Sequence, residues 1–199
     1  MNWQEFTALL ALSTAMSFTP GPNTTLATAI AANRGLAHAM RFVCSVPVGW
    51  SALLLLCAAG AGALVMALPP LKWGIQAVGV GYLLWLAWQL GHKATLAQVD
   101  DSRLDIGFWQ GAALQFVNIK VWLLSLAIVA GWIAGRADAV SRLLVVVPVI
   151  QFFAFTSNLL YASMGALLRG WLARGRRLLW FNRAMAAVLV FTAVWMLTV

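Results

Sequence analysis

The stretch SFTPGPNTTL occupies residues 17–26 and decides how the first apolar segment of this 199-residue chain folds. It lies inside an uncharged run from Phe6 to Asn33, which is longer than the ~20 residues that a membrane-spanning helix needs. Proline lacks an amide hydrogen and clashes with the carbonyl four residues before it, so these prolines must interrupt such a helix. We therefore predict a transmembrane helix that is broken at Pro20-Gly21-Pro22.

The composition is that of a polytopic membrane protein. Hydrophobic residues make up 63% of the chain, charged residues make up 9%, and the mean hydropathy is +0.88. A soluble domain needs more charged surface than this. The net charge of +8 comes from basic residues in short gaps between apolar runs, which argues against nucleic acid as a partner. Membrane lipids are the expected surroundings.

Six apolar segments reach the length of a spanning helix, and together they predict an all-α membrane protein with one domain over residues 1–199. The first Lys or Arg is Arg34, so the basic region of a signal peptide is missing and the first segment is expected to remain in the protein. The six segments are roughly residues 6–33, 42–68, 73–91, 106–135, 143–168 and 178–199.

The basic residues predict the orientation of these segments. Nine of the 13 Lys and Arg residues lie in or beside the first, third and fifth connections, and three lie on the other side. This bias predicts that the odd-numbered connections lie in the cytoplasm and that both termini lie outside it. Three spans that are repeated once return upside down, so residues 1–95 and 104–199 are expected to form two inverted three-helix repeats, as in many secondary transporters.

The broken first helix suggests a site for a small zwitterion. Its prolines release backbone carbonyls, which attract an ammonium group, and Asn23 is predicted to cap a new half-helix that begins near Thr24. The positive end of that half-helix attracts a carboxylate. The alternative is a kink that serves only helix packing. The candidate substrate-binding residues in this segment are Thr19, Pro20, Gly21, Pro22 and Asn23.

A second polar group lies in the fourth segment, where Gln115, Asn118 and Lys120 are far from either end. A lysine at membrane depth costs at least ~2.5 kcal/mol and marks a functional site by default. Lys120 could bind a substrate carboxylate or titrate; the alternative is a structural lysine that is held by freed carbonyls. Gln115 and Asn118 either bind substrate or only join helices. The same choice applies to Asn158 in the fifth segment.

The positions of the acidic residues argue against a metal site. None of Glu5, Asp100, Asp101, Asp105 and Asp138 lies in the middle of a segment, so no metal and no cofactor are expected, and a neutral amino acid is favoured as substrate. We do not expect an enzyme, because a lone lysine lacks the supporting groups of a catalytic nucleophile. A channel or an intramembrane enzyme that uses Lys120 is the alternative of another class.

Six short spans with TPGPN in the first resemble the LysE/RhtB family of amino-acid exporters, and the likeness covers nearly the whole chain. The stretch AVGVGYLLWLAWQL at residues 77–90 is similar to the end of that family's third span. The stretch LQFVNIK at residues 114–120 is similar to the branch that exports cysteine and O-acetylserine. Where the family usually has Asn-Pro-Lys, this chain has Ile119 in place of proline, which leaves open whether the fourth span is broken.

The resemblance implies export of a small amino acid from the cytoplasm across the bacterial inner membrane, by alternating access and driven by the proton-motive force. Both termini would then lie in the periplasm. Cysteine or O-acetylserine is the expected substrate, and homoserine, threonine or another amino acid is the alternative. It also implies a site at residues 20–23 with Asn118 and Lys120 opposite. A homodimer stays open, since Gly107 and Gly111 form a GxxxG pattern that fits either close helix packing or a dimer face.

Overall fold

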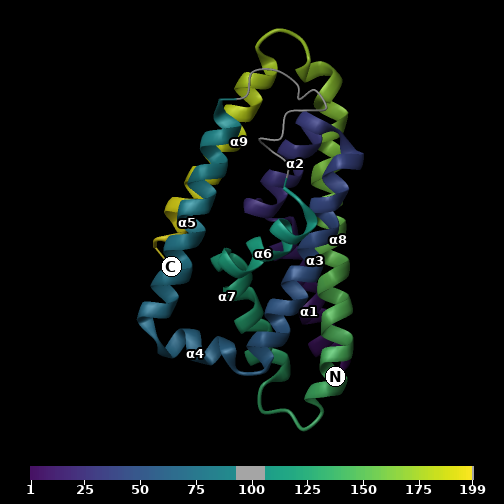
Figure 1. The fold of residues 1–199 in the computed structure, drawn as a ribbon. Coiled ribbons are helices and arrows are strands. Elements are labelled where there is room, and N and C mark those ends of the chain that lie inside the picture. The colour runs from purple at the N-terminus through teal and green to yellow at the C-terminus, as the bar shows by residue number, and fades with distance from the viewer. Residues whose placement is uncertain (93–105, 199) are drawn as a thin grey trace.

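The computed structural model describes residues 1–92 and 106–198, and the regular elements within them are all helices (Figure 1). The all-α prediction is therefore confirmed for this part of the chain. The connection with Lys93 and Arg103, and the expected boundary between the halves, lie outside the described residues. The first helices are α1 (Trp3–Phe18), α2 (Pro22–Arg34), α3 (Leu36–Ala58), α4 (Ala61–Ala67) and α5 (Pro69–Gly91). They are followed by α6 (Phe108–Val117), α7 (Ile119–Ile128), a π-helical turn (Val129–Ile133), α8 (Ala139–Leu172) and α9 (Arg177–Met196).

Three to five segments of the described chain are long and apolar enough to cross a membrane. Helices α3, α8 and α9 qualify alone, and two bent pairs qualify together, namely α4 with α5 and α6 with α7 and the π-helical turn. The first expected span corresponds to α1 and α2, which have only 16 and 13 residues. The structure thus supports a multi-pass helical protein with fewer clear spans than the six that the sequence predicts.

The break in the first helix is confirmed. Helix α1 ends at Phe18 and α2 begins at Pro22. The prediction that Asn23 caps α2 is wrong, because Gly21 is the capping residue and its N–H donates to Thr24 Oγ1 at 3.0 Å. The pyrrolidine ring fixes a helical φ and proline has no N–H to satisfy, so the new helix can start at Pro22 itself.

The fourth segment is also broken, although it has no proline. Helix α6 ends at Val117, α7 begins at Ile119, and the pair is bent by 70°. Asn118 lies between them with extended backbone, and its Oδ1 accepts from the N–H of Lys120 at 3.2 Å. An asparagine N-cap therefore starts the second half-helix here.

The expected second span is shorter than the sequence predicts. Residues 42–68 do not form one helix, because α3 ends at Ala58 and α4 starts at Ala61. Gly60 lies between them with φ +102°, a left-handed conformation that a glycine adopts without steric cost. Residues 42–68 are more than a spanning helix needs, and the turn at Gly60 divides the excess length from α3.

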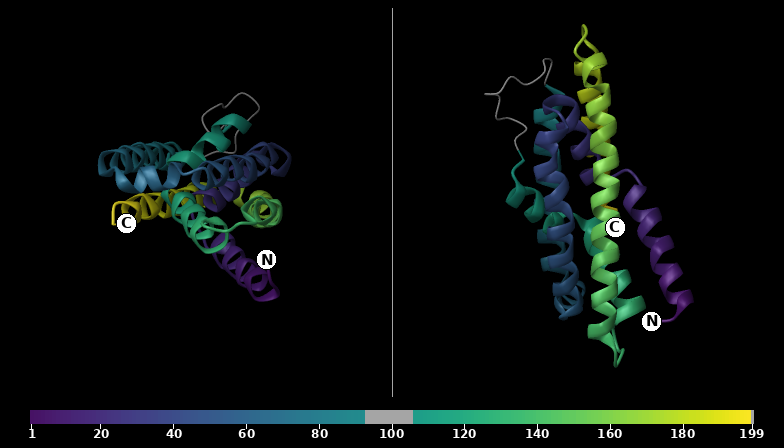
Figure 2. Two further views of the ribbon diagram at one scale, coloured as in Figure 1. Left: turned by 90° about the horizontal axis from the view of Figure 1, so that it is seen from below. Right: turned by 90° about the vertical axis from the view of Figure 1, so that its right-hand side faces the viewer.

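Helix α2 lies at the centre of the bundle, and the other helices pack around it in pairs (Figure 2). Every residue from Thr24 to Asn33 is buried. Helix α2 packs against α8, α3 packs against α6 and α8, and α5 packs against α9. Glycines allow the closest approaches: a Cβ on Gly165 would lie 2.2 Å from the Thr28 carbonyl oxygen, and one on Gly111 would lie 2.1 Å from Ser45 Oγ. Of the two roles left open for the Gly107 and Gly111 pattern, Gly111 takes part in close helix packing within the chain.

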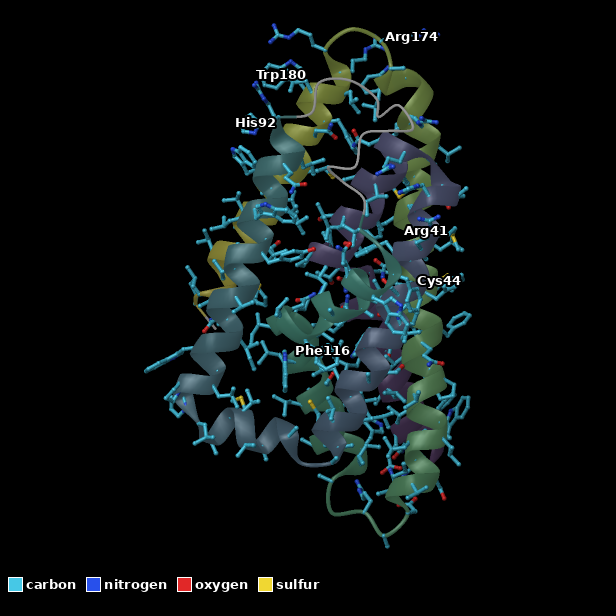
Figure 3. The ribbon with its side chains drawn as sticks, viewed as in Figure 1. Arg41, Cys44, His92, Phe116, Arg174 and Trp180 are labelled. Carbon is cyan, nitrogen blue, oxygen red and sulfur yellow. The ribbon has the colours of Figure 1, made fainter. Side chains whose placement is uncertain are left out.

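The two ends of the bundle differ in character. Arg41, His92 and Arg174 lie toward the end that carries the turn between α8 and α9 (Figure 3). The opposite end carries the N-terminus and the turn before α8. The bulk of the described basic side chains thus lies away from the N-terminus.

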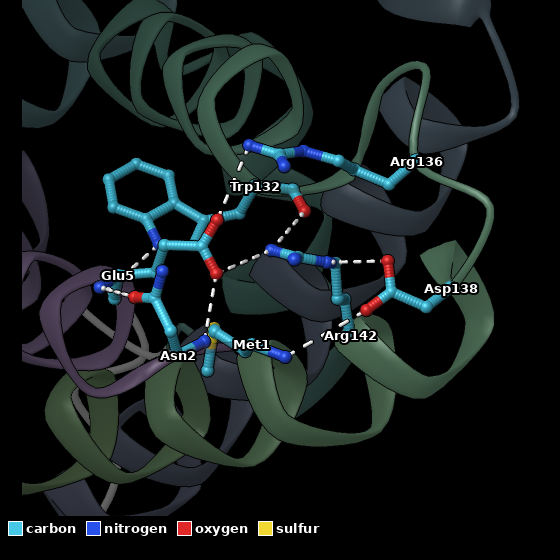
Figure 4. Close-up of polar contacts among 7 residues, drawn as sticks. All are labelled: Met1, Asn2, Glu5, Trp132, Arg136, Asp138 and Arg142. Atoms are coloured by element: carbon cyan, nitrogen blue, oxygen red, sulfur yellow. Dashed lines mark hydrogen bonds and ion pairs between the residues drawn. The ribbon is translucent and has the colours of Figure 1, made fainter.

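An ion-pair cluster holds α1 to the start of α8 at the N-terminal end (Figure 4). Arg142 is 7% exposed, and its guanidinium donates to Asp138 Oδ1 at 2.8 Å and to Glu5 Oε2 at 3.1 Å. Arg136 pairs with the other oxygen of Glu5 at 3.3 Å. The N–H of Asn2 and then the Arg142 guanidinium hold the pKa of Glu5 below its usual value, and the bond from Arg142 lowers the pKa of Asp138.

Candidate functional site

The two helix breaks meet at one cavity of about 40 Å³, which is room for roughly three water molecules. The end of α1, the first turn of α2 and the first turn of α7 surround it, and α3 and α8 complete the wall. The first N–H groups of α2 and α7 have no acceptor within their own helices, so two positive helix ends face this space. The lining residues are Met16, Ser17, Thr19, Gly21, Pro22, Asn23, Thr24, Val46, Trp50, Asn118, Lys120, Val121, Leu124, Ala154, Ser157 and Asn158.

Most of the residues that the sequence proposed for the site line this cavity. They are Thr19, Gly21, Pro22, Asn23, Asn118, Lys120 and Asn158. Pro20 is exposed and does not line the cavity. Gln115 is fully buried and lies behind Asn23. The structure thus brings together residues from positions about 100 apart in the chain.

Lys120 reaches from the second break to the first. Its Nζ donates to the carbonyl oxygen of Thr19 at 3.1 Å. Gly21 leaves room for this contact, because a Cβ at that position would lie 3.4 Å from Nζ. The lysine therefore holds a carbonyl that the break has freed, which is the structural alternative that the sequence left open.

The neighbouring freed carbonyl is also held from another helix. The hydroxyl of Tyr161 on α8 donates to the carbonyl oxygen of Phe18 at 3.0 Å. The last two carbonyls before the break are thus held by side chains of α7 and α8, so the break is stabilised by contacts from the second half of the chain.

Asn23 and Gln115 form a reciprocal amide pair between α2 and α6. Asn23 Nδ2 donates to Gln115 Oε1 at 2.8 Å, and Gln115 Nε2 donates to Asn23 Oδ1 at 3.2 Å and to the Gly111 carbonyl at 3.0 Å. The side-chain amide of Asn23 is therefore satisfied by the protein. Gln115 takes the helix-joining role that was its alternative.

Two polar atoms of the cavity wall have no hydrogen-bond partner among the described residues. Asn158 is 3% exposed, and its Nδ2 donates to Ala154 while its Oδ1 is unpaired. Ser17 is 8% exposed, and its Oγ is unpaired. Buried polar atoms are rarely left unpaired, so a ligand or water is expected to satisfy both. Sequence reasoning missed Ser17, although Ser13 and Ser17 lie four residues apart on an apolar helix and so mark one polar face.

The cavity wall is largely apolar and carries a few polar groups. Lys120 is the one Lys, Arg, Asp or Glu among the lining residues that the structure describes. Across residues 1–92 and 106–198, no group of His, Cys, Asp and Glu is arranged to hold a metal ion. The wall thus offers hydrogen-bond acceptors, helix N-termini and one amine, a combination that suits a small zwitterion better than a metal ion.

Comparison with known proteins gives consistent matches. The family model described as LysE type translocator matches residues 14–199. A cysteine/O-acetylserine efflux protein of Klebsiella pneumoniae is 32% identical over 188 residues, which covers 94% of each chain. The protein of that name from Escherichia coli K12 is 30% identical over 92% of this chain and 91% of its own. No solved structure gives a significant match. The chain therefore belongs to the family of LysE type translocators, and it is a transporter and not an enzyme.

Proposed function

We propose that the protein exports small neutral amino acids across the bacterial inner membrane, with cysteine and O-acetylserine as the principal substrates. The names of the Klebsiella and Escherichia relatives favour these two substrates. The observation that carries the proposal is the cavity at which the two helix breaks meet. Homoserine and threonine are the nearest other substrates, and they differ from cysteine and O-acetylserine mainly in the side chain.

The chemistry of the cavity wall suits both ends of an amino acid. The ammonium group would donate to the Thr19 carbonyl, to Ser17 Oγ and to Asn158 Oδ1, which are acceptors of residues that line the cavity. The carboxylate would lie at the first turns of α2 and α7, where Asn118 caps α7. Of the residues predicted for binding, Pro20 and Gln115 would act indirectly, the first by breaking the helix and the second by holding Asn23.

The two breaks favour an inverted repeat as the basis of alternating access. Each half of the chain begins with a broken helix, α1 with α2 and α6 with α7, and continues with longer helices. The broken helix of each half packs against the following long helix of the other, since α1 and α2 contact α8 while α6 and α7 contact α3. Such reciprocal contacts are what a two-fold relation between the halves would produce, and rocking of the halves would open the cavity to each side in turn.

The distribution of charge favours an orientation for this movement. The end with Arg41 and Arg174 would face the cytoplasm, and the N-terminus and the Glu5–Arg142 cluster would face the periplasm (Figure 3, Figure 4). Both termini would then be periplasmic. Substrate would enter from the basic end, and the proton-motive force would drive its release at the other.

Transport by purified protein in vesicles tests the proposal. Vesicles are loaded with single labelled amino acids, and efflux and counterflow are measured with and without a pH gradient. A carrier gives saturable efflux and counterflow, and we expect the lowest half-saturation concentration for cysteine or O-acetylserine. Efflux that neither saturates nor shows counterflow would indicate a channel and would reject the proposal. The absence of transport for every amino acid of the panel would reject it as well.

A further inference from the structure

We propose that the ammonium group of Lys120 is an internal competitor for the substrate, and that this competition couples export to proton entry. The proposal rests on the proposed function, since it assigns the coupling group of the same site. Lys120 Nζ donates a hydrogen bond to the carbonyl oxygen of Thr19 at 3.1 Å. This carbonyl is one that the proposed pose gives to the ammonium group of the substrate.

The size of the cavity indicates that lysine and substrate cannot be held together. The volume of about 40 Å³ suits roughly three water molecules, which is fewer than the non-hydrogen atoms of any amino acid. The side chain of Lys120 lines this space and extends past Gly21 to the break. Withdrawal of this side chain would both enlarge the cavity and free the carbonyl.

The charges around Lys120 make the competition depend on a proton. Two cations cannot share one carbonyl in a medium of low dielectric constant, because their repulsion is strong there. The polar groups that face the cavity from the other helices are neutral: Ser17 on α1, Asn23 on α2, Trp50 on α3 and Asn158 on α8. Tyr161 on α8 lies outside the cavity lining, and its hydroxyl donates to the Phe18 carbonyl at 3.0 Å.

The absence of a carboxylate from the described cavity wall means that no lining acid holds Lys120 in its charged form. In the cytoplasm-facing state, Lys120 releases one proton to the cytoplasm, its neutral amine leaves Thr19, and the substrate ammonium takes the carbonyl. After the substrate leaves to the outside, Lys120 takes one proton from the outside and returns to Thr19. Each cycle moves one zwitterion out and one proton in.

Substitution of Lys120 separates coupling from binding. Lys120→Gln keeps a hydrogen-bond donor but carries no proton, so we expect counterflow without a gradient to persist and the acceleration by a pH gradient to be lost. Lys120→Arg keeps a fixed charge on the carbonyl, so we expect both activities to be lost. Lys72→Gln, at the start of α5 and outside the cavity lining, is the matched control and should behave like the wild type.

A measurement on the unaltered protein covers the case in which the variants do not fold. Addition of saturating cysteine to the purified wild-type protein in weak buffer should release about one proton per bound molecule, as the one-for-one exchange requires. The proposal is overturned if no proton is released, if Lys120→Gln keeps its acceleration by the gradient, or if folded Lys120→Gln loses counterflow. Failure of the proposed function would look different, since the wild-type protein would then show no counterflow of any amino acid.

Discussion

The amide pair between Asn23 and Gln115 gives the sharpest test of how the site is held. We expect Asn23→Ala to raise the half-saturation concentration for transport. The reason is the loss of the amide pair, because the side-chain amide of Asn23 is bonded to Gln115 at 2.8 and 3.2 Å. Hydrogen bonds between membrane helices average ~0.6 kcal/mol, so two bonds amount to about 1.2 kcal/mol. This corresponds to roughly an eightfold change in an equilibrium constant.

A double-mutant cycle measures the effect. Half-saturation concentrations for counterflow are determined for wild type, Asn23→Ala, Gln115→Ala and the double variant. Each single variant should show a rise of roughly eightfold if the pair positions the first turn of α2, and the double variant should show little more. Gln110→Ala is the matched control on the same helix, because Gln110 accepts only from the nearby Gly107 N–H at an exposed position.

Additive effects of the two single substitutions would refute this reasoning. They would mean that Asn23 and Gln115 act separately, with Asn23 in direct contact with the substrate. Unchanged kinetics in both single variants would refute it as well, since the pair would then have no part in positioning the site. The cycle thus distinguishes a positioning role from a binding role for the same residue.

Three further predictions concern packing, acidity and the unpaired serine. Gly165→Ala should lower the free energy of unfolding by ~1–3 kcal/mol in a denaturation assay because its Cβ meets backbone, whereas Gly170→Ala, which meets nothing within 4 Å, should not. The pKa of Glu5 is lowered in the fold, so this carboxylate stabilises the protein above its ordinary pKa, and the stabilisation is lost as the pH falls through the lowered pKa. The melting temperature should therefore drop on acidification, and it should drop less in Glu5→Gln. Ser17→Ala should raise the half-saturation concentration by losing a cavity acceptor, whereas Ser13→Ala, buried but outside the cavity, should not.

The first break could be predicted from the sequence because its cause is local. Proline removes a donor and clashes within one turn, so Pro20 and Pro22 interrupt a helix whatever surrounds them. The second break has a weaker local signal: Asn118 can cap a helix, but asparagine also occurs within continuous membrane helices. In the structure, Asn118 caps α7 and the helix is broken there. The turn at Gly60 is a similar case, because a glycine permits a turn without requiring one.

The residues of the site could be found in part, whereas their partners could not. Polarity at membrane depth identified Lys120 and Asn23, because such residues are costly without a role. Which groups they meet depends on how helices rotate and pack against one another, which a single sequence does not state. Only the structure shows that Lys120 donates to the Thr19 carbonyl and that Tyr161 donates to the adjacent carbonyl of Phe18.

The contacts that close the bundle at its two ends bear on the proposed cycle. Asn33 of α2 and Asn182 of α9, both fully buried, exchange hydrogen bonds at 2.8 and 3.1 Å near the basic end. Glu5 of α1 and Arg142 of α8 form an ion pair at 3.1 Å at the other end. Each contact joins the first half of the chain to the second, so the two halves are in contact at both ends of the bundle in this conformation.

In the proposed cycle, rocking of the halves would break one of these contacts while the other persists, so that the cavity opens to one side at a time. The bonds from Lys120 to Thr19 and from Tyr161 to Phe18 also join the two halves. Any relative movement of the halves therefore disturbs the carbonyls that the substrate would occupy. In the proposed cycle, exchange of one ammonium group for another at the Thr19 carbonyl would therefore be the event that permits the movement.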